Sequence, residues 1–423
     1  DGAARSFPAR VSSAARAALL RAQELMPTLD PAWAEEDFPT PAPPPRATAT
    51  LPAGSIWSVG HAAERLALLV RDADPDAQHI AEEAATLTGL LDALAAGRDP
   101  YAGRHGAIRR AYRSELDGQL QEYSVYVPPS YRGDTDFPAI VGLHGLRGSN
   151  HRMLPILLGI YDEREDRTHA DRHLPEMPDA QALLVAPWGY GDAMYRQQGE
   201  VDVLRALEEV RRYYRVDTTR TYMTGLSMGG IGAAGVPLHH PGVFAAAASL
   251  CGYHSYFVRS DTRGVRRPWE TFLMELRSNA SFAENGLHLP MYVVQGTLDR
   301  PITHSTALTE RYTALGYTLL SEFPTLDHNV WSTTYADGRI VPHFLQFRRD
   351  AHPRALRFRT PELRWNTSDW LTIDALTGPD GRATTQRTGH WADFTLDSSR
   401  DATGRATTSG IAAFTLTPPR AAY

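Results

Sequence analysis

The sequence predicts an α/β fold with a mostly parallel central sheet, an N-terminal helical extension and a small C-terminal β domain. Three changes in hydrophobic periodicity along the 423 residues support this prediction. Helical spacing fills the first hundred residues, short apolar runs then alternate with helical segments, and strand patterns alone follow. We therefore divide the chain into a helical extension (residues 1–105), a central α/β domain (106–351) and a β domain (352–423).

The helical extension is expected from apolar residues at three- and four-residue spacing. Three segments show this spacing: residues 11–26, 60–73 and 77–97.

The central domain begins where the period changes to two. Asp117-Gly118 separates two alternating runs, residues 107–114 and 119–131, which predicts a β-hairpin. Further strands are expected at 138–145, 181–187, 220–225, 244–252, 290–296 and 317–324. Helices are expected at 200–214, directly after 225, and at 305–316. Continuously apolar strands that alternate with helices predict a mostly parallel sheet buried on both faces.

The C-terminal β domain is expected from strand patterns without intervening helices. Its runs lie at residues 356–376, 389–397 and 410–419, separated by Gly, Asp, Ser and Thr clusters.

Composition excludes several classes of function. All 43 basic residues are arginine, so a P-loop, a lysine Schiff base and a Ser-Lys dyad are excluded. The net charge of −6 and the lack of a basic stripe argue against a nucleic-acid partner. No apolar run is long enough to span a bilayer. Cys251 is the single cysteine and is expected to be a buried, inert thiol.

A serine motif lies in the middle of the chain. Residues 225–229 read Gly-Leu-Ser-Met-Gly, between an apolar strand and a small-residue helix. In this G-x-S-x-G context the serine is exposed on a sharp turn beside a helix N-terminus. We interpret Ser227 as a nucleophile rather than an ordinary residue of a glycine-rich loop.

A serine hydroxyl needs a base to take its proton and an acid to orient that base. Asp299 follows one predicted strand and His328 follows the next, which is the chain order expected after such a turn. His239, His254 and His304 are the alternative bases and are expected to be packing or surface residues. Asp327 is the alternative acid, but its side chain should point away from its neighbour His328.

Two main-chain N–H groups should stabilise the oxyanion. We expect the first from Met228, directly after the serine. The second is expected from Leu146, which follows His144-Gly145 at the end of an early strand.

Four stretches together resemble the α/β-hydrolase superfamily: LHGLRGSN (143–150), residues 202–230, VVQGTLDRPI (293–302) and DHNVW (327–331). More narrowly, they are similar to bacterial esterases of the polyhydroxyalkanoate-depolymerase-like and feruloyl-esterase-like types, and to the related prolyl oligopeptidase family. The resemblance covers about residues 107–350. It implies Ser227 as nucleophile, Asp299 as acid, His328 as base, and Leu146 with Met228 as oxyanion donors, without a metal or other cofactor.

These observations predict a serine carboxylic-ester hydrolase that acts through an acyl-enzyme on a small or carbohydrate-linked ester. A serine peptidase of the prolyl oligopeptidase type is the alternative, although about 100 helical residues cannot build the propeller typical of such enzymes. A binding protein on an inactive hydrolase fold is the third hypothesis. Trp188, Tyr190 and Trp331 are candidate substrate contacts, with Tyr195, Tyr253 and Tyr256 also in loops near the site.

The compartment and the oligomeric state are open at this stage. Because the chain begins at Asp1, we expect a secreted or periplasmic protein, with a cytoplasmic one as the alternative. The sequence does not indicate an oligomeric state.

Overall fold

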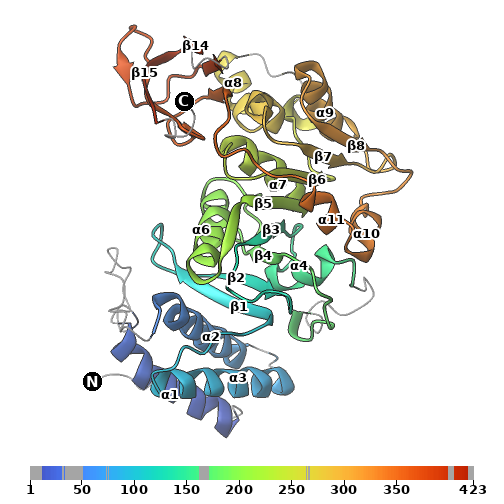
Figure 1. The fold of residues 1–423 in the computed structure, drawn as a ribbon. Helices are drawn as coiled ribbons and strands as arrows, with labels where there is room; N and C mark the ends of the chain where they lie inside the picture. The colour runs from blue at the N-terminus through green and yellow to red at the C-terminus, as the bar shows by residue number, and fades with distance from the viewer. Residues whose placement is uncertain are drawn as a thin grey trace.

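The computed structural model describes residues 12–30, 33, 51–72, 74, 76–161, 171–262, 264, 267–398 and 404–417. Three N-terminal helices pack together beside one edge of the central sheet (Figure 1). They are α1 (Ser13–Leu29), α2 (Ala53–Arg71) and α3 (Ala77–Ala95). The first and last are each capped by a side chain, Ser12 and Asp76, that accepts an N–H of the first turn.

In the described residues, eight strands form the central sheet, in the order β1-β2-β4-β3-β5-β6-β7-β8. Strand β2 runs antiparallel to both neighbours and the other pairs are parallel, so the predicted α/β class with a mostly parallel sheet is confirmed. The predicted hairpin at Asp117-Gly118 joins β1 to β2. The strands are β1 (Gly106–Arg113), β2 (Leu120–Val127), β3 (Phe137–Leu143), β4 (Leu183–Pro187), β5 (Val216–Leu226), β6 (Ala246–Leu250), β7 (Met291–Val294) and β8 (Leu319–Glu322).

Helices cover both faces of this sheet, and alternate side chains of each central strand face opposite cores. Val141 and Met223 pack on the face covered by α6 (Gln198–Tyr213), α7 (Met228–His239) and α9 (Thr303–Leu315). Ile140 and Tyr222 pack on the other face, against α4 (Asn150–Leu157), α10 (Trp331–Thr334) and α11 (Ile340–Leu345).

Several short elements lie outside the predicted pattern. They are α4, α8 (Pro268–Leu276), α10, α11 and the 3₁₀ turns at Tyr256–Val258, Ser260–Thr262, Asn279–Gly286 and Ala336–Gly338. Each of these elements has nine residues or fewer. Segments this short contain too few residues for a hydrophobic period to identify them. No helix in the described ranges is both long and apolar enough to cross a membrane.

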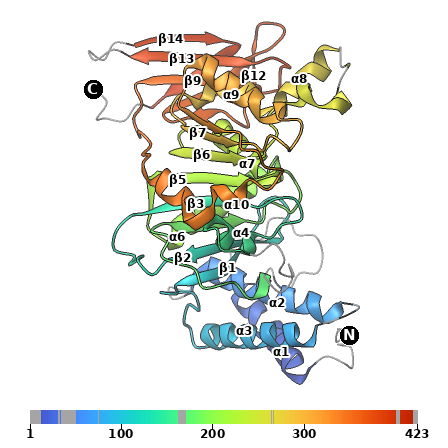
Figure 2. The same ribbon diagram turned by 90° about the vertical axis from the view of Figure 1, so that its right-hand side faces the viewer.

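The C-terminal strands form two antiparallel sheets with a small core of their own. One sheet pairs β9 (Ala355–Thr360), β13 (Ala392–Ser398) and β14 (Gly404–Ser409). The other contains β10 (Thr367–Ser368), β11 (Leu371–Thr377), β12 (Ala383–Thr384) and β15 (Ile411–Leu416). Figure 2 places these strands at the end of the molecule opposite to α1, α2 and α3. Neither extension therefore interrupts the central sheet.

Candidate active site

Ser227 lies at the turn between β5 and α7, at the carboxyl edge of the central sheet. Its backbone has φ 56° and ψ −117°, which residues other than glycine rarely adopt. The Ser227 N–H donates to the Leu250 carbonyl at 2.8 Å, and the Ile231 N–H donates to the Ser227 carbonyl at 3.3 Å. The serine is thus held on a strained turn from both sides, as its motif predicts.

The glycines of the motif allow the backbone around Ser227 to pack closely. A Cβ atom on Gly229 would lie 2.0 Å from the Leu143 carbonyl oxygen. One on Gly225 would lie 2.4 Å from the Gly229 carbonyl oxygen. Because these distances are far below van der Waals contact, only glycine allows β3, β5 and α7 to approach each other at this turn.

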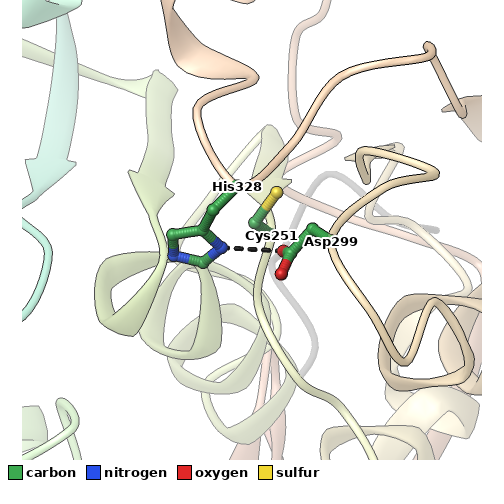
Figure 3. A group of neighbouring side chains, drawn as sticks. All are labelled: Cys251, Asp299 and His328. Carbon is green, nitrogen blue, oxygen red and sulfur yellow. Dashed lines mark hydrogen bonds and ion pairs between the residues drawn. The ribbon is translucent and has the colours of Figure 1, made fainter.

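His328 connects the serine to an acid. Its Nε2 lies 2.8 Å from Ser227 Oγ. Its Nδ1 lies 2.7 Å from Asp299 Oδ2, the contact that Figure 3 shows as a dashed line. When Nδ1–H donates to the carboxylate, Nε2 keeps a lone pair that accepts the serine hydroxyl. The structure thus brings together the three predicted residues, from the loops that follow β5, β7 and β8.

Asp299, rather than Asp327, contacts the histidine. Asp327 Oδ1 accepts the main-chain N–H of Asn329 at 3.0 Å. Gln295 Nε2 donates to Asp299 Oδ2 at 2.8 Å, so the oxygen that contacts the ring has a second donor that fixes the carboxylate. Burial raises the pKa of Asp299, but the hydrogen bonds from His328 and Gln295 outweigh this and hold the pKa below its usual value. The acid is therefore ionised at neutral pH.

The acid and base loops are tied to each other through the main chain. The Leu298 N–H donates to the Leu326 carbonyl at 3.0 Å, and the Thr297 N–H donates to the Pro324 carbonyl at 2.9 Å. The His328 side chain is 48% exposed, so a substrate can reach the ring and the serine from solvent.

The alternative histidines have other partners. His239 Nδ1 lies 3.1 Å from a buried glutamate, and His254 Nε2 lies 3.0 Å from a buried serine. His304 packs its ring on a tyrosine, with the ring centroids 4.9 Å apart. Burial lowers the pKa of all three, which favours neutral packing histidines.

Two main-chain N–H groups lie beside the nucleophile turn. Met228 is the first residue of α7, where the helix N-terminus carries partial positive charge. Gly145 packs on the turn, since a Cβ there would lie 3.5 Å from Ser227 Cβ, and Leu146 comes next in the chain. Among the described residues, neither the Leu146 nor the Met228 N–H has a backbone or side-chain acceptor. Both are placed to donate to an oxyanion.

The loop after β4 supports this region, and the sequence analysis missed its role. Asp192 Oδ1 accepts the Arg147 N–H at 2.8 Å, directly after Leu146. The Tyr195 hydroxyl donates to the His144 carbonyl at 3.3 Å. Gly189 and Gly191 predict a loop. No local sequence pattern indicates that this loop contacts residues about 45 positions earlier in the chain, such as Arg147.

The candidate substrate contacts differ in their placement. Trp331 lies edge-on to His328, with the ring centroids 5.5 Å apart. Trp188 is 37% exposed and packs on His144. The Tyr190 hydroxyl lies 2.7 Å from Ser114 Oγ, at the end of β1. The structure does not bring Tyr190 to the triad, because its side chain is directed toward the first hairpin.

Cys251 is buried, as the sequence predicts, with 5% of its surface exposed. Burial, together with the nearby Asp299 charge, raises the pKa of its thiol to about 12, so it is not a nucleophile. Its position beside Asp299 and His328 was not predicted. The sequence of β6 does not indicate which loops lie next to the residue that follows this strand.

Comparison with known proteins identifies a related family. Residues 116–317 match the family model described as "Putative esterase", a segment that contains Ser227 and Asp299 and ends just before His328. No curated protein sequence matches at a significant level.

Three solved structures are similar to this chain. A thermostable esterase is 18% identical over 57% of this chain and 63% of its own chain, with a TM-score of 0.42. A ferulic acid esterase is 17% identical over 57% of this chain and 99% of its own, with a TM-score of 0.43. An acylaminoacyl peptidase of Pyrococcus horikoshii is 14% identical over 56% of this chain and 40% of its own, with a TM-score of 0.39.

Proposed function

We propose that the chain is a serine hydrolase of esterase type, which cleaves carboxylic esters through an acyl-enzyme on Ser227. The observation that carries this proposal is the continuous hydrogen-bonded line from Ser227 through His328 to Asp299. A hydroxyl, an imidazole and a carboxylate in this order are what acyl transfer needs.

The reaction begins when Ser227 Oγ attacks the ester carbonyl carbon and its proton moves to His328 Nε2. Asp299 stabilises the imidazolium through Nδ1. The C–O bond to the alcohol then breaks, and the Nε2 proton goes to the leaving oxygen. Water, deprotonated by the same nitrogen, attacks the acyl-enzyme and releases the acid and Ser227.

Leu146 and Met228 donate their N–H groups to the carbonyl oxygen as it gains negative charge. Removing one such donor typically reduces kcat by about 100- to 1,000-fold. Asp192 contributes indirectly, because it holds the residue after Leu146.

The substrate class follows from the openness of the site. With His328 half exposed, a large alcohol can remain in solvent while the acyl group contacts apolar side chains. Trp331 beside His328 and Leu298 next to Asp299 offer such surface, with the partly exposed Trp188 on His144 farther along the same edge, and aromatic rings stack on planar acyl groups or sugars. We therefore propose a small or carbohydrate-linked ester as substrate and leave Tyr190 out of this set.

A fluorophosphonate probe tests the nucleophile. Wild-type protein should be labelled at Ser227, and Ser227→Ala should lose labelling and ester turnover, the latter by at least about 10,000-fold. Labelling that survives the substitution would contradict the assignment.

A substrate panel separates the two reaction classes. Short p-nitrophenyl esters and methyl ferulate should be turned over faster than prolyl amides, because an alcohol leaves more easily than an amine. Faster amide turnover would favour a peptidase of the prolyl oligopeptidase type.

A further inference from the structure

Cys251 lies at the carboxyl end of β6, directly beside the acid and the base (Figure 3). Its Sγ, a carboxylate oxygen of Asp299 and a ring nitrogen of His328 lie within 4.8 Å of one another. In the described part of the chain, this is the one group of three such side chains close enough to share a metal ion. We propose that the three side chains bind a divalent cation that accepts mixed ligands, with Zn²⁺ as the typical case, and that this binding switches off the active site.

The separations fit a tetrahedral ion after small side-chain movements. Zinc bonds of about 2.0–2.3 Å place neighbouring ligand atoms roughly 3.3–3.6 Å apart. The pair of His328 Nδ1 and Asp299 Oδ2, now 2.7 Å apart, must open by less than about 1 Å, and the sulfur must approach from at most 4.8 Å. Rotation of the Asp299 and His328 side chains supplies such shifts without moving a strand.

The position of the sulfur is set by its main-chain surroundings. Main-chain hydrogen bonds from Gly296 and Val330 lower the pKa of the thiol, although burial outweighs them while no metal is bound. The backbone of Cys251 is fixed, since its N–H donates to the Val294 carbonyl at 2.8 Å. The exposed side of His328 leaves the fourth position of the ion open to water.

The inhibition rests on the proposed function of the triad. On binding, the thiol proton passes to water and a sulfur–metal bond forms, so about one proton is released for each ion. His328 then binds the metal through Nδ1 and carries its proton on Nε2. A protonated Nε2 cannot accept the Ser227 proton, and Asp299 no longer orients the ring. No oxidation or reduction is involved.

Cobalt binding tests the site without any need for activity. Because Cys251 is the single cysteine of the sequence, thiolate-to-cobalt charge-transfer absorption can come only from this residue. The inactive Ser227→Ala protein should show this absorption when Co²⁺ is added, and excess Zn²⁺ should abolish it. In the same background, Cys251→Ser should lose the absorption and bind Zn²⁺ at least about tenfold more weakly in calorimetry. Binding of Co²⁺ without the absorption, or equal Zn²⁺ affinity of the two proteins, would overturn the proposal.

A second variant guards against misfolding. Asp299→Ala in the Ser227→Ala background keeps the thiol but should also weaken Zn²⁺ binding, whereas Asp327→Ala should not. In wild-type protein, Zn²⁺ should inhibit ester hydrolysis, and Cys251→Ser should need at least tenfold more Zn²⁺ for the same fractional inhibition. If the binding results hold but wild-type protein hydrolyses no ester, the metal site stands and the proposed function fails.

Discussion

The two halves of the candidate active site are held in opposite ways. The nucleophile half is fixed by buried neighbours: Ser227 itself is partly exposed, but the elements on either side are packed, and the buried Ser249 Oγ donates to the Gly230 carbonyl at 2.8 Å. The base half is exposed, and hydrogen bonds at the surface orient His328. The core therefore sets the position of the serine, whereas polar contacts set the position of the imidazole. Changes to the first half should reduce stability, and changes to the second should mainly reduce activity.

The largest expected effect concerns the acid. Asp299→Asn should reduce kcat by about 10,000-fold, because the amide favours the wrong tautomer of His328. Urea unfolding should show a change below about 1 kcal/mol, since the carboxylate is partly exposed. Steady-state assays with a p-nitrophenyl ester measure the first quantity.

Asp327→Asn is the matched control. It removes the same charge one residue from His328 but leaves the Asp299 contact in place, so kcat should stay within about threefold of wild type. Equal losses in the two variants would mean that charge near the ring, rather than its orientation, matters.

A smaller effect, now on stability, should follow from Gly229→Ala. The new Cβ would lie 2.0 Å from the Leu143 carbonyl oxygen, so the helix must shift, which costs about 3 kcal/mol. Because the shift also moves Ser227, kcat should fall by about 100-fold. Urea denaturation and the ester assay check the two parts.

Gly89→Ala is the control for this substitution. Gly89 lies inside α3, and no atom beyond its chain neighbours and the nearby backbone of that helix lies within 4 Å of the position of its Cβ. Alanine should stabilise that helix by up to about 1 kcal/mol and leave kcat unchanged. Destabilisation of similar size in both variants would argue against a special packing requirement at Gly229.

The same contrast explains what the sequence could predict. Ser227 was identified because a strained turn needs glycines at fixed spacing, which leaves a local pattern. Asp299 and His328 were selected only because each follows a strand that ends at the same edge. Asp192, Gln295 and Cys251 carry no local mark, since their roles depend on contacts between distant loops. The contact of the Tyr190 hydroxyl with Ser114 was not predicted for the same reason.

Elements of the fold, like the site residues, were predicted where they leave a local sequence pattern and missed where they do not. The parallel strands were predicted because burial on both faces makes them continuous apolar runs, and α6 was predicted because burial on one face gives it a helical period. Helix α4 was missed because its eight residues include Pro155, and its start depends on the Ser149 side chain, which accepts N–H groups of its first turn.

The smallest expected effect is a pH dependence of the nucleophile half. His254 is buried beneath α7, and its Nε2 lies 3.0 Å from Ser249 Oγ. Asn279 Nδ2 donates to its Nδ1 at 3.0 Å, so the ring must be neutral to accept this bond. Burial, with the nearby charges of His304 and Arg196, lowers the pKa of His254 to about 3.

The unfolded chain takes up this proton near pH 6.5, but the folded chain does not, so the contribution of His254 to stability is complete above about pH 6.5 and is lost as the pH falls toward 3. His254→Gln should lower stability at pH 7.5, because the bonds to Ser249 and Asn279 are disturbed. It should also flatten the decline between pH 6 and pH 4 by up to about 1.4 kcal/mol per pH unit, measured by urea unfolding at each pH. His352→Gln, at an exposed position, should keep the wild-type slope. A His254→Gln slope equal to wild type would mean that acid destabilises the protein elsewhere, and that the packing beneath the nucleophile does not depend on a neutral ring.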